Sequence, residues 1–219
     1  MRRQGEGVIP GEGAVLSYRL KRALYLNVTS RCTLRCRFCP KFHGLWSVAG
    51  APLQLAHGDE PSAAALLAAA RDHDGCEEIV FCGLGEPTRR LDTVLAVARE
   101  LRACGLPLRL NTDGLASLIH GRDVTPDLEG LIDRVSISLN AHSEVVYDWY
   151  CRPQRAGSFA AVLAFARRAR DFVPEVTLTA IAGLPGVDLA ACQAHAQRLG
   201  VGFRIRPLES TDDDTFHVR

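Results

Sequence analysis

The sequence predicts an α/β protein whose core is a parallel sheet. Six short apolar runs recur along the chain, and a helical segment separates each run from the next. The longest connections, 29–60 and 141–157, follow the first and fourth runs, and long loops after strand ends carry ligand sites in such folds. Periodicity alone leaves open whether the sheet is doubly wound or forms part of a barrel.

The six predicted strands are runs rich in Val, Ile, Leu and Phe that end at polar or glycine residues. They cover 23–28, 78–82, 108–111, 134–139, 175–181 and 203–208. In the last strand, Arg204 and Arg206 share one face and Ile205 lies on the other, because strand side chains alternate. Those two arginines are therefore expected to act together.

Five helical segments are predicted between the strands. They cover 63–72, 91–103, a start at 125–129, 159–172 and 189–199. Thr125, Ser158 and Asp188 are expected to cap the last three helices, because their side-chain oxygens can accept from free backbone N–H groups. Gly105 and Gly200 are expected to end the second and fifth helices.

Length and charge point to one domain without a strongly charged partner. The 219 residues divide into a flexible arm at 1–18, a core domain at 19–212 and a polar tail at 213–219. A net charge of +1 and an aromatic content of 6% argue against nucleic-acid binding. No apolar run reaches the ~18 residues of a membrane span, and no signal peptide is evident, so a cytoplasmic protein is expected.

The first long loop carries Cys32, Cys36 and Cys39 in a C-x3-C-x2-C pattern. Three thiolates within eight residues can bind a soft metal centre. One interpretation is a zinc site completed by His43 or Cys76. The other is a [4Fe–4S] cluster, which with three cysteines keeps one iron open to an exogenous ligand. Disulfides are not expected in a reducing compartment.

With Phe38 before the third cysteine, the pattern C-x3-C-x-aromatic-C directly after a first strand resembles the signature of the radical SAM superfamily. The resemblance implies a partial (βα)6 TIM-type barrel of parallel strands. It also implies that Cys32, Cys36 and Cys39 bind a [4Fe–4S] cluster whose open iron chelates S-adenosylmethionine. In that family, one electron from the reduced cluster yields a 5′-deoxyadenosyl radical that abstracts hydrogen from a substrate. An electron donor such as flavodoxin or ferredoxin is then implied as a partner.

Later strand ends resemble the cofactor-binding turns of the same family. Gly83, Gly85 and Glu86 resemble its G-G-E-P motif, with Leu84 inserted. Here the glycines would allow close approach of the ligand, and Glu86 would accept from its ammonium group. The other expected cofactor contacts are Phe38, Asn111 and Thr112 in a T-N-G-like turn, Ser138 and Asn140 in an S-L-D-like segment, and Gly183. Each of these is also an ordinary turn residue when taken singly.

Five cationic side chains are candidates for binding an anionic substrate group: Lys41, His43, Arg152, Arg204 and Arg206. If Arg204 and Arg206 face a barrel interior, they need an anionic partner, which can be a substrate carboxylate or phosphate or the carboxylate of S-adenosylmethionine. The alternative is an exposed edge strand with solvated arginines. No catalytic residue is assigned.

The five other cysteines form no second cluster motif. Cys104 and Cys192 are expected in the core, Cys151 in a loop, and Cys82 near the site, while Cys76 has no assigned role.

Within the superfamily, the stretches 24–44, 81–88, 111–126 and 138–153 resemble the TatD-linked radical SAM proteins, for which no reaction can be transferred. A glycyl-radical-enzyme activase and a 7-carboxy-7-deazaguanine synthase are the alternative enzymes. A zinc-stabilised, non-catalytic α/β binding module is the alternative of another class.

Overall fold

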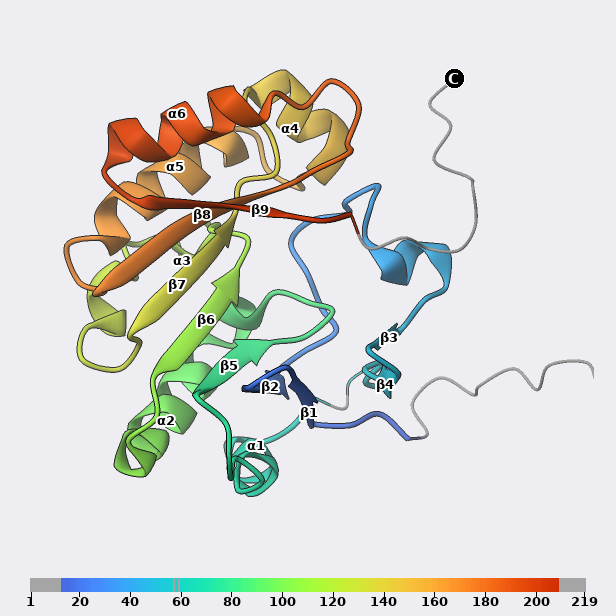
Figure 1. Ribbon diagram of the computed structural model, residues 1–219, viewed down its shortest axis with the longest axis vertical. Helices are drawn as coiled ribbons and strands as arrows, with labels where there is room; N and C mark the ends of the chain where they lie inside the picture. Colours follow the sequence, from blue (N-terminus) through green and yellow to red (C-terminus); the bar gives the residue numbers. More distant parts are fainter. Residues whose placement is uncertain (1–12, 57, 59, 209–219) are drawn as a thin grey trace, which may run out of the picture.

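The computed structural model describes residues 13–56, 58 and 60–208, and its main sheet has seven strands in the order β1-β2-β5-β6-β7-β8-β9 (Figure 1). The strands are β1 (Ser17–Leu20), β2 (Ala23–Asn27), β5 (Glu78–Cys82), β6 (Leu108–Thr112), β7 (Arg134–Ser138), β8 (Glu175–Ile181) and β9 (Gly202–Arg206). All neighbours from β2 to β9 pair in parallel, and β1 pairs antiparallel with β2. The order is linear, so the six parallel strands form the predicted partial barrel and not a closed one.

Helices cover the outer face of the curved sheet (Figure 1). They are α1 (Ala63–Ala70), α2 (Leu91–Leu101), α3 (Ala116–His120), α4 (Glu144–Cys151), α5 (Ser158–Ala169) and α6 (Leu189–Leu199). Short 3-10 segments are η1 (Pro40–His43), η2 (Pro87–Arg90), η3 (Arg102–Cys104) and η4 (Thr125–Leu128), and β3 (Ser47–Val48) pairs with β4 (Ala51–Pro52). Within the described ranges, none of these helices is long and apolar enough to cross a membrane.

The two faces of the sheet differ in polarity. The outward-facing strand residues are apolar and buried against the helices: Leu24, Leu26, Ile79, Phe81, Leu108, Leu110, Val135, Ile137 and Leu178. The inward-facing residues alternate with them and are mostly polar, among them Asn111, Ser136 and Thr177. The hydrophobic core therefore lies between sheet and helices, and the inside of the barrel is left for polar groups.

The expected arm and tail are only partly within the described chain. Strand β1 begins at Ser17, so the ordered sheet starts inside the range 1–18 that was expected to be an arm. Backbone hydrogen bonds from Val15 to Pro52 and from Asn27 to Leu16 also tie this segment down. Residues 1–12 and the expected tail at 213–219 lie outside the described residues.

Two predicted helix starts are wrong. Thr125 does not cap an α-helix: it begins the 3-10 segment η4, and its hydroxyl donates to Asp123. Ser158 is the first residue of α5 and its hydroxyl donates to the carbonyl of Arg155, while Gly157 takes the cap position with a positive φ. The prediction for Asp188 is confirmed, since its carboxylate accepts from the backbone N–H of Ala191 at 3.0 Å.

The fourth connection contains a helix that periodicity did not predict. Helix α4 lies within 141–157, and Ser143 caps it by accepting from Val146 at 3.5 Å. The sequence signal was present, because Ser143 followed by Glu144 is a typical helix start. Helix α4 has only eight residues, which is too few for the helical repeat of its apolar residues to stand out in the sequence.

A buried pair of carboxyl groups ties the ends of β5 and β6 together. Glu86 Oε1 accepts from Thr88 N at 2.9 Å, Thr88 Oγ1 at 2.7 Å and Thr112 Oγ1 at 2.8 Å, and its Oε2 accepts from Asp113 N at 2.6 Å. The Asp113 carboxylate accepts from Leu115 N and from the hydroxyl of Thr33 in the cysteine loop. One pair of acids thus holds three segments of chain in register.

Two glycines let the loop after β2 lie directly on the segment after β5. A Cβ atom on Gly85 would lie 2.3 Å from the carbonyl oxygen of Arg31 and 2.5 Å from that of Thr29. A Cβ atom on Gly83, whose φ is +136°, would lie 2.7 Å from the carbonyl oxygen of Thr29. Both contacts are with backbone atoms, so no side-chain rotation can relieve them.

Replacing Glu86 should change how stability depends on pH. Burial, followed by repulsion from Asp113, raises the pKa of Glu86 from 4.5 to about 8, so the folded protein binds a proton that the unfolded chain has lost. This contribution to stability is fully present below pH 4.5 and is lost as the pH rises through 8. Thermal unfolding of the wild type should therefore move to lower temperature between pH 5 and 8.

Glu86→Gln cannot titrate and should flatten that slope, whereas Glu100→Gln on the exposed face of α2 should leave it unchanged. Equal slopes in the wild type and Glu86→Gln would contradict the assignment.

Substituting Gly85 should destabilise the fold through overlap with the loop. Gly85→Ala should lower the free energy of unfolding by about 2–4 kcal/mol, measured by urea denaturation, because the backbone of 29–31 must shift. Gly130→Ala is the matched control: its φ is +67° and the space around it is open, so only about 1 kcal/mol of backbone strain is expected. A smaller loss for Gly85→Ala than for Gly130→Ala would disprove the close approach.

Candidate functional site

The loop with three cysteines leaves the carboxyl end of β2 and is anchored to the end of α4. The backbone N–H of Arg35 donates to the carbonyl of Cys151 at 3.1 Å, and that of Arg37 donates to the carbonyl of Tyr150 at 2.8 Å. An isolated β-bridge joins Leu34 to Pro153. The first and fourth connections of the barrel therefore pack together, although they are more than 100 residues apart in sequence.

The thiols of Cys32, Cys36 and Cys39 are free and partly buried. Burial raises the pKa of Cys32, and the nearby carboxyl groups of Asp113 and Glu86 raise it further. A hydrogen bond with Cys151 and then burial raise the pKa of Cys36, and burial raises that of Cys39. These surroundings favour neutral thiols until a metal centre supplies the positive charge that stabilises thiolates.

Cys151 and Tyr147 line the same region, and sequence reasoning missed both. Cys151 was expected to be an ordinary loop cysteine, but it is the fully buried last residue of α4 and hydrogen-bonds with Cys36. The hydroxyl of Tyr147 is buried and has no hydrogen-bond partner within the described chain. Burial raises the pKa of Tyr147, and nearby Cys151, Asp113 and Cys36 raise it further. A buried, unsatisfied donor among thiols fits a site that receives a further acceptor.

The donor set fits an iron–sulfur cluster. Among the residues that the structure describes, no group of three or more His, Cys, Asp or Glu side chains is placed to hold a single metal ion. The three cysteines of a [4Fe–4S] cluster each bind a different iron and need not converge. The residues present are three partly buried cysteines on one anchored loop, and they suit such a cluster.

The residues of the G-L-G-E-P segment contact other parts of the chain, whereas the sequence predicted that they would contact the cofactor. Glu86 was expected to accept from a ligand ammonium, but its Oε1 already accepts from three donors of the chain and its Oε2 accepts from Asp113 N. The close approaches of Gly83 and Gly85 are to Thr29 and Arg31. These residues therefore position the cysteine loop.

The T-N-G-like turn divides between the two sides of β6. Thr112 faces outward, where its hydroxyl donates to Glu86 and accepts from Gly114 N at 3.1 Å. Asn111 faces inward, where its Oδ1 accepts from Arg109 Nη1 at 3.0 Å and its Nδ2 donates to Cys82 Sγ at 3.6 Å. Asn111 and Cys82 therefore lie in the barrel interior, while Thr112 supports the buried acids.

The remaining expected cofactor contacts sit at strand ends or beside the loop. Ser138 ends β7 half-buried, and Asn140 follows it buried, with a φ of +58°. Gly183, after β8, adopts a φ of +88° with open space where a Cβ atom would be. The ring of Phe38 packs on Tyr150 at 6.4 Å between centroids. All four lie at the carboxyl edge of the barrel or on the cysteine loop.

Three of the candidate substrate residues lie on or beside the cysteine loop. Lys41 is 8% exposed and its Nζ donates to the carbonyl of Ser30 at 3.3 Å, so it supports the loop. The ring of His43 hydrogen-bonds with the carbonyl of Arg37 at 2.6 Å. Arg152 is exposed at the end of α4 with a φ of +49°.

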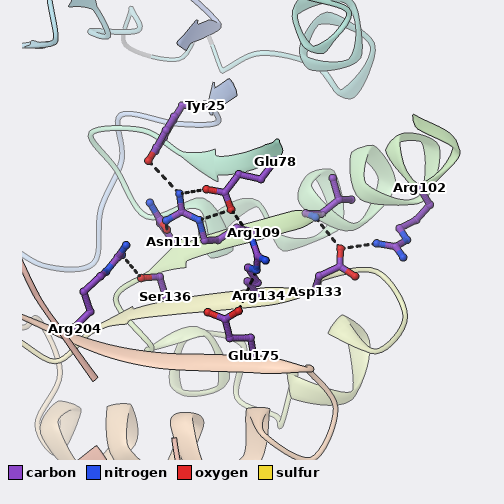
Figure 2. Close-up of polar contacts among 11 residues, drawn as sticks. Tyr25, Glu78, Arg102, Arg109, Asn111, Asp133, Arg134, Ser136, Glu175 and Arg204 are labelled. Atoms are coloured by element: carbon purple, nitrogen blue, oxygen red, sulfur yellow. Dashed lines mark hydrogen bonds and ion pairs between the residues drawn. The ribbon is translucent and has the colours of Figure 1, made fainter. Parts of the chain in front are cut away.

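Arg204 and Arg206 both lie on the inner face of β9. Arg204 Nη2 donates to Ser136 Oγ at 3.0 Å, and Arg206 Nη2 donates to Asn140 Oδ1 at 3.1 Å. Figure 2 shows Arg204 reaching toward Ser136 on β7. Both of the alternatives expected from sequence hold in part: β9 is an edge strand on which Arg204 is exposed and Arg206 half-buried, and both side chains lie on its inner face.

The other cysteines are mostly structural. Cys192 is fully buried in α6, and Cys76 and Cys104 pack half-buried against the core, as expected for small apolar side chains.

Relatives with assigned names match most of the chain. It is 32% identical over 206 residues to a GTP 3′,8-cyclase of Mycobacterium sp. (strain KMS), covering 91% of this chain and 54% of the relative. It is 32% identical over 167 residues to GTP 3′,8-cyclase 2 of Mycobacterium tuberculosis (strain ATCC 25618 / H37Rv), covering 74% of this chain and 44% of the relative. The chain thus spans about half the length of these relatives.

Solved structures share the fold at low sequence identity. SuiB of Streptococcus suis, solved bound to S-adenosylmethionine, aligns with a TM-score of 0.59 and 13% identity over 87% of this chain and 39% of SuiB. The FeFe-hydrogenase maturase HydG of Carboxydothermus hydrogenoformans aligns with a TM-score of 0.59 and 17% identity over 90% of this chain and 46% of HydG.

The family profile described as the radical SAM superfamily matches residues 26–199, which run from the end of β2 through the end of α6. Members of this superfamily are enzymes that use a [4Fe–4S] cluster and S-adenosylmethionine. The partial barrel, the cysteine loop at its carboxyl edge and this match together show that the chain belongs to the radical SAM superfamily.

Proposed function

We propose that Cys32, Cys36 and Cys39 bind the [4Fe–4S] cluster and that the polar interior of the barrel binds S-adenosylmethionine and a substrate. The observation that carries this proposal is the placement of all three cysteines on one loop, fixed to α4 by backbone hydrogen bonds and to the buried acids by Thr33. When bound, the reduced cluster supplies one electron that cleaves S-adenosylmethionine to a 5′-deoxyadenosyl radical, which abstracts hydrogen from the substrate.

The chain's own residues position and shield this chemistry. Asp113 and Glu86 hold the loop at the ends of β5 and β6, and Cys151 hydrogen-bonds with Cys36. Asn111, Ser138, Asn140 and Gly183 offer polar side chains and open backbone at strand ends for the cofactor. Phe38 and Tyr150 cover the loop with apolar surface, which helps to exclude water.

The surface around the three cysteines favours an acidic reductant. Arg31, Arg35 and Arg37 alternate with the cysteines and are exposed. Arg37 lies 3.9 Å above the ring of Trp149, which is 51% exposed. A basic rim around a partly apolar surface fits a small acidic electron carrier such as flavodoxin or ferredoxin.

A purine nucleotide is the first substrate to test. The relatives named GTP 3′,8-cyclase favour this class, although the chain spans only about half of their length. The stretches resembling TatD-linked radical SAM proteins favour an enzyme of that group. No described residue favours a glycyl-radical-enzyme activase or a 7-carboxy-7-deazaguanine synthase.

Anaerobic reconstitution with iron and sulfide tests the cluster assignment. The wild type should turn brown, carry a [4Fe–4S] cluster by iron and sulfide analysis, and release 5′-deoxyadenosine when reduced with S-adenosylmethionine. Cys32→Ala, Cys36→Ala and Cys39→Ala should each lose both properties, because each removes one cluster ligand.

Cys104→Ala is the matched control and should keep the cluster, since Cys104 packs half-buried against the core and supplies no ligand. A colourless protein with stoichiometric zinc would overturn the proposal, and so would a cluster retained in all three loop variants.

The reductant surface is tested by charge reversal. Arg35→Glu should slow cluster reduction by reduced flavodoxin about fivefold at low ionic strength, measured by stopped-flow absorbance, because it weakens electrostatic attraction. Reduction by dithionite should change less than twofold. Arg167→Glu on the exposed face of α5 is the control, and an equal effect of both variants would argue against a local docking surface.

A further inference from the structure

The inside of the barrel carries more positive than negative charge. Its inward-facing strand positions include four arginines, Arg109, Arg134, Arg204 and Arg206, and two glutamates, Glu78 and Glu175. In closed (βα)8 barrels the same positions hold bulky branched residues that fill the interior. Several of these side chains are open to solvent: Arg134 is 41% exposed, Glu175 is 59% exposed, and Arg204 is exposed. The inner face therefore presents charged groups that a ligand can reach.

Two of the arginines are already neutralised by acids. Arg109 donates to Glu78 through Nε at 3.1 Å and Nη2 at 2.8 Å, and also to Tyr25 and Asn111 (Figure 2). Arg134 lies between Glu78 and Glu175, with N–O distances of 3.3 and 3.0 Å. This arrangement is a fixed wall: its charges compensate one another, and the donors of Arg109 are engaged.

Arg204 differs from these two arginines. Its hydrogen bond goes to the neutral hydroxyl of Ser136, and within the described chain no carboxylate pairs with it. A guanidinium has five N–H donors in a planar fork, so Arg204 keeps several donors for a ligand. Arg206 lies two residues further toward the carboxyl edge on the same face, about 6–7 Å along the strand.

A small cavity of about 80 Å³ lies among these groups. It is lined by Arg204, Ser136, Thr177, Arg109, Arg134 and Glu175. Arg134 and Glu175, which line the cavity, are the first residues of β7 and β8, and Arg204 is the middle residue of β9. The cavity therefore lies on the inner face of the sheet toward the amino ends of the strands, and the cysteine loop emerges at the opposite, carboxyl edge.

We propose that Arg204, with Ser136 and Thr177, binds an anionic group of the substrate, a phosphate or a carboxylate, inside the barrel. This inference rests on the proposed function for the identity of the ligand as substrate. Ser136 and Thr177 add neutral hydroxyls that suit the outer oxygens of either anion. In the Glu78–Arg109–Arg134–Glu175 wall each charge already has an opposite partner, so Arg204 is the stronger attraction for the anion.

Binding to the reconstituted holoenzyme, measured by anaerobic calorimetry, distinguishes the sources of the anion. One arm uses GTP and inorganic triphosphate, with guanosine as the phosphate-free comparison. The other arm uses L-glutamate and N-acetyl-L-glutamate. For whichever of these ligands binds the wild type, Arg204→Gln should raise the Kd of that ligand about 10- to 100-fold, as expected for losing a charge-assisted hydrogen bond.

Arg204→Lys should recover part of this affinity, and Arg167→Gln on α5 should change Kd less than twofold. Binding in the triphosphate arm identifies a phosphorylated substrate, and binding in the glutamate arm identifies a carboxylate. The inference is overturned if neither arm binds the wild type, or if Arg204→Gln leaves Kd unchanged. It is also overturned if the variant weakens only S-adenosylmethionine, because Arg204 then serves the cofactor.

Release of 5′-deoxyadenosine, measured in parallel, separates the two proposals. If the wild type cleaves S-adenosylmethionine but binds no anion, only the anion site fails. If it binds the anion through Arg204 but forms no cluster, the proposed function fails and the anion site stands.

Discussion

The buried carboxyl pair of Glu86 and Asp113 is the constraint on which the carboxyl edge of this barrel depends. It accepts hydrogen bonds from the turn after β5, from the end of β6 and, through Thr33, from the cysteine loop. Burying two acids side by side is unfavourable unless they share a proton and their remaining oxygens are satisfied. The raised pKa of Glu86, about 8, provides the proton, and the four donors provide the rest.

The same hydrogen bonds explain why the G-L-G-E-P motif resembles a ligand site in sequence but supports the cysteine loop in the structure. The glycines of 83–85 approach backbone carbonyls, and Glu86 is saturated by its own chain. The cysteine loop is held from the opposite side by α4, through the hydrogen bonds to Cys151 and Tyr150. The three thiols are partly buried between the acid pair with its glycine turn on one side and helix α4 on the other.

Much of the fold and part of the site could be predicted from sequence. The strands β5 and β8 begin and end where the apolar runs do, because buried strands have strong local signals. Helix α4 and strand β1 were missed, since the first is too short to show its period and the second is stabilised by pairing with β2.

In the site, the cysteine loop could be predicted because the spacing of its three cysteines is visible in the sequence. Asp113, Tyr147 and the Cys151–Cys36 contact depend on tertiary packing, which one sequence does not reveal. The shared face of Arg204 and Arg206 followed from strand alternation, but the acids that neutralise Arg109 and Arg134 required the register between strands.

The linear order of the sheet has a mechanical consequence. A closed barrel fixes its diameter, because every strand is hydrogen-bonded on both sides. Here β1 and β9 end the sheet, and no strand pairing joins them across the described residues. The width of the interior is therefore not fixed by a closing ladder of hydrogen bonds between strands. It depends on the twist between neighbouring strands and on the packing of the helices, and Arg204 lies on one of the two strands that end the sheet.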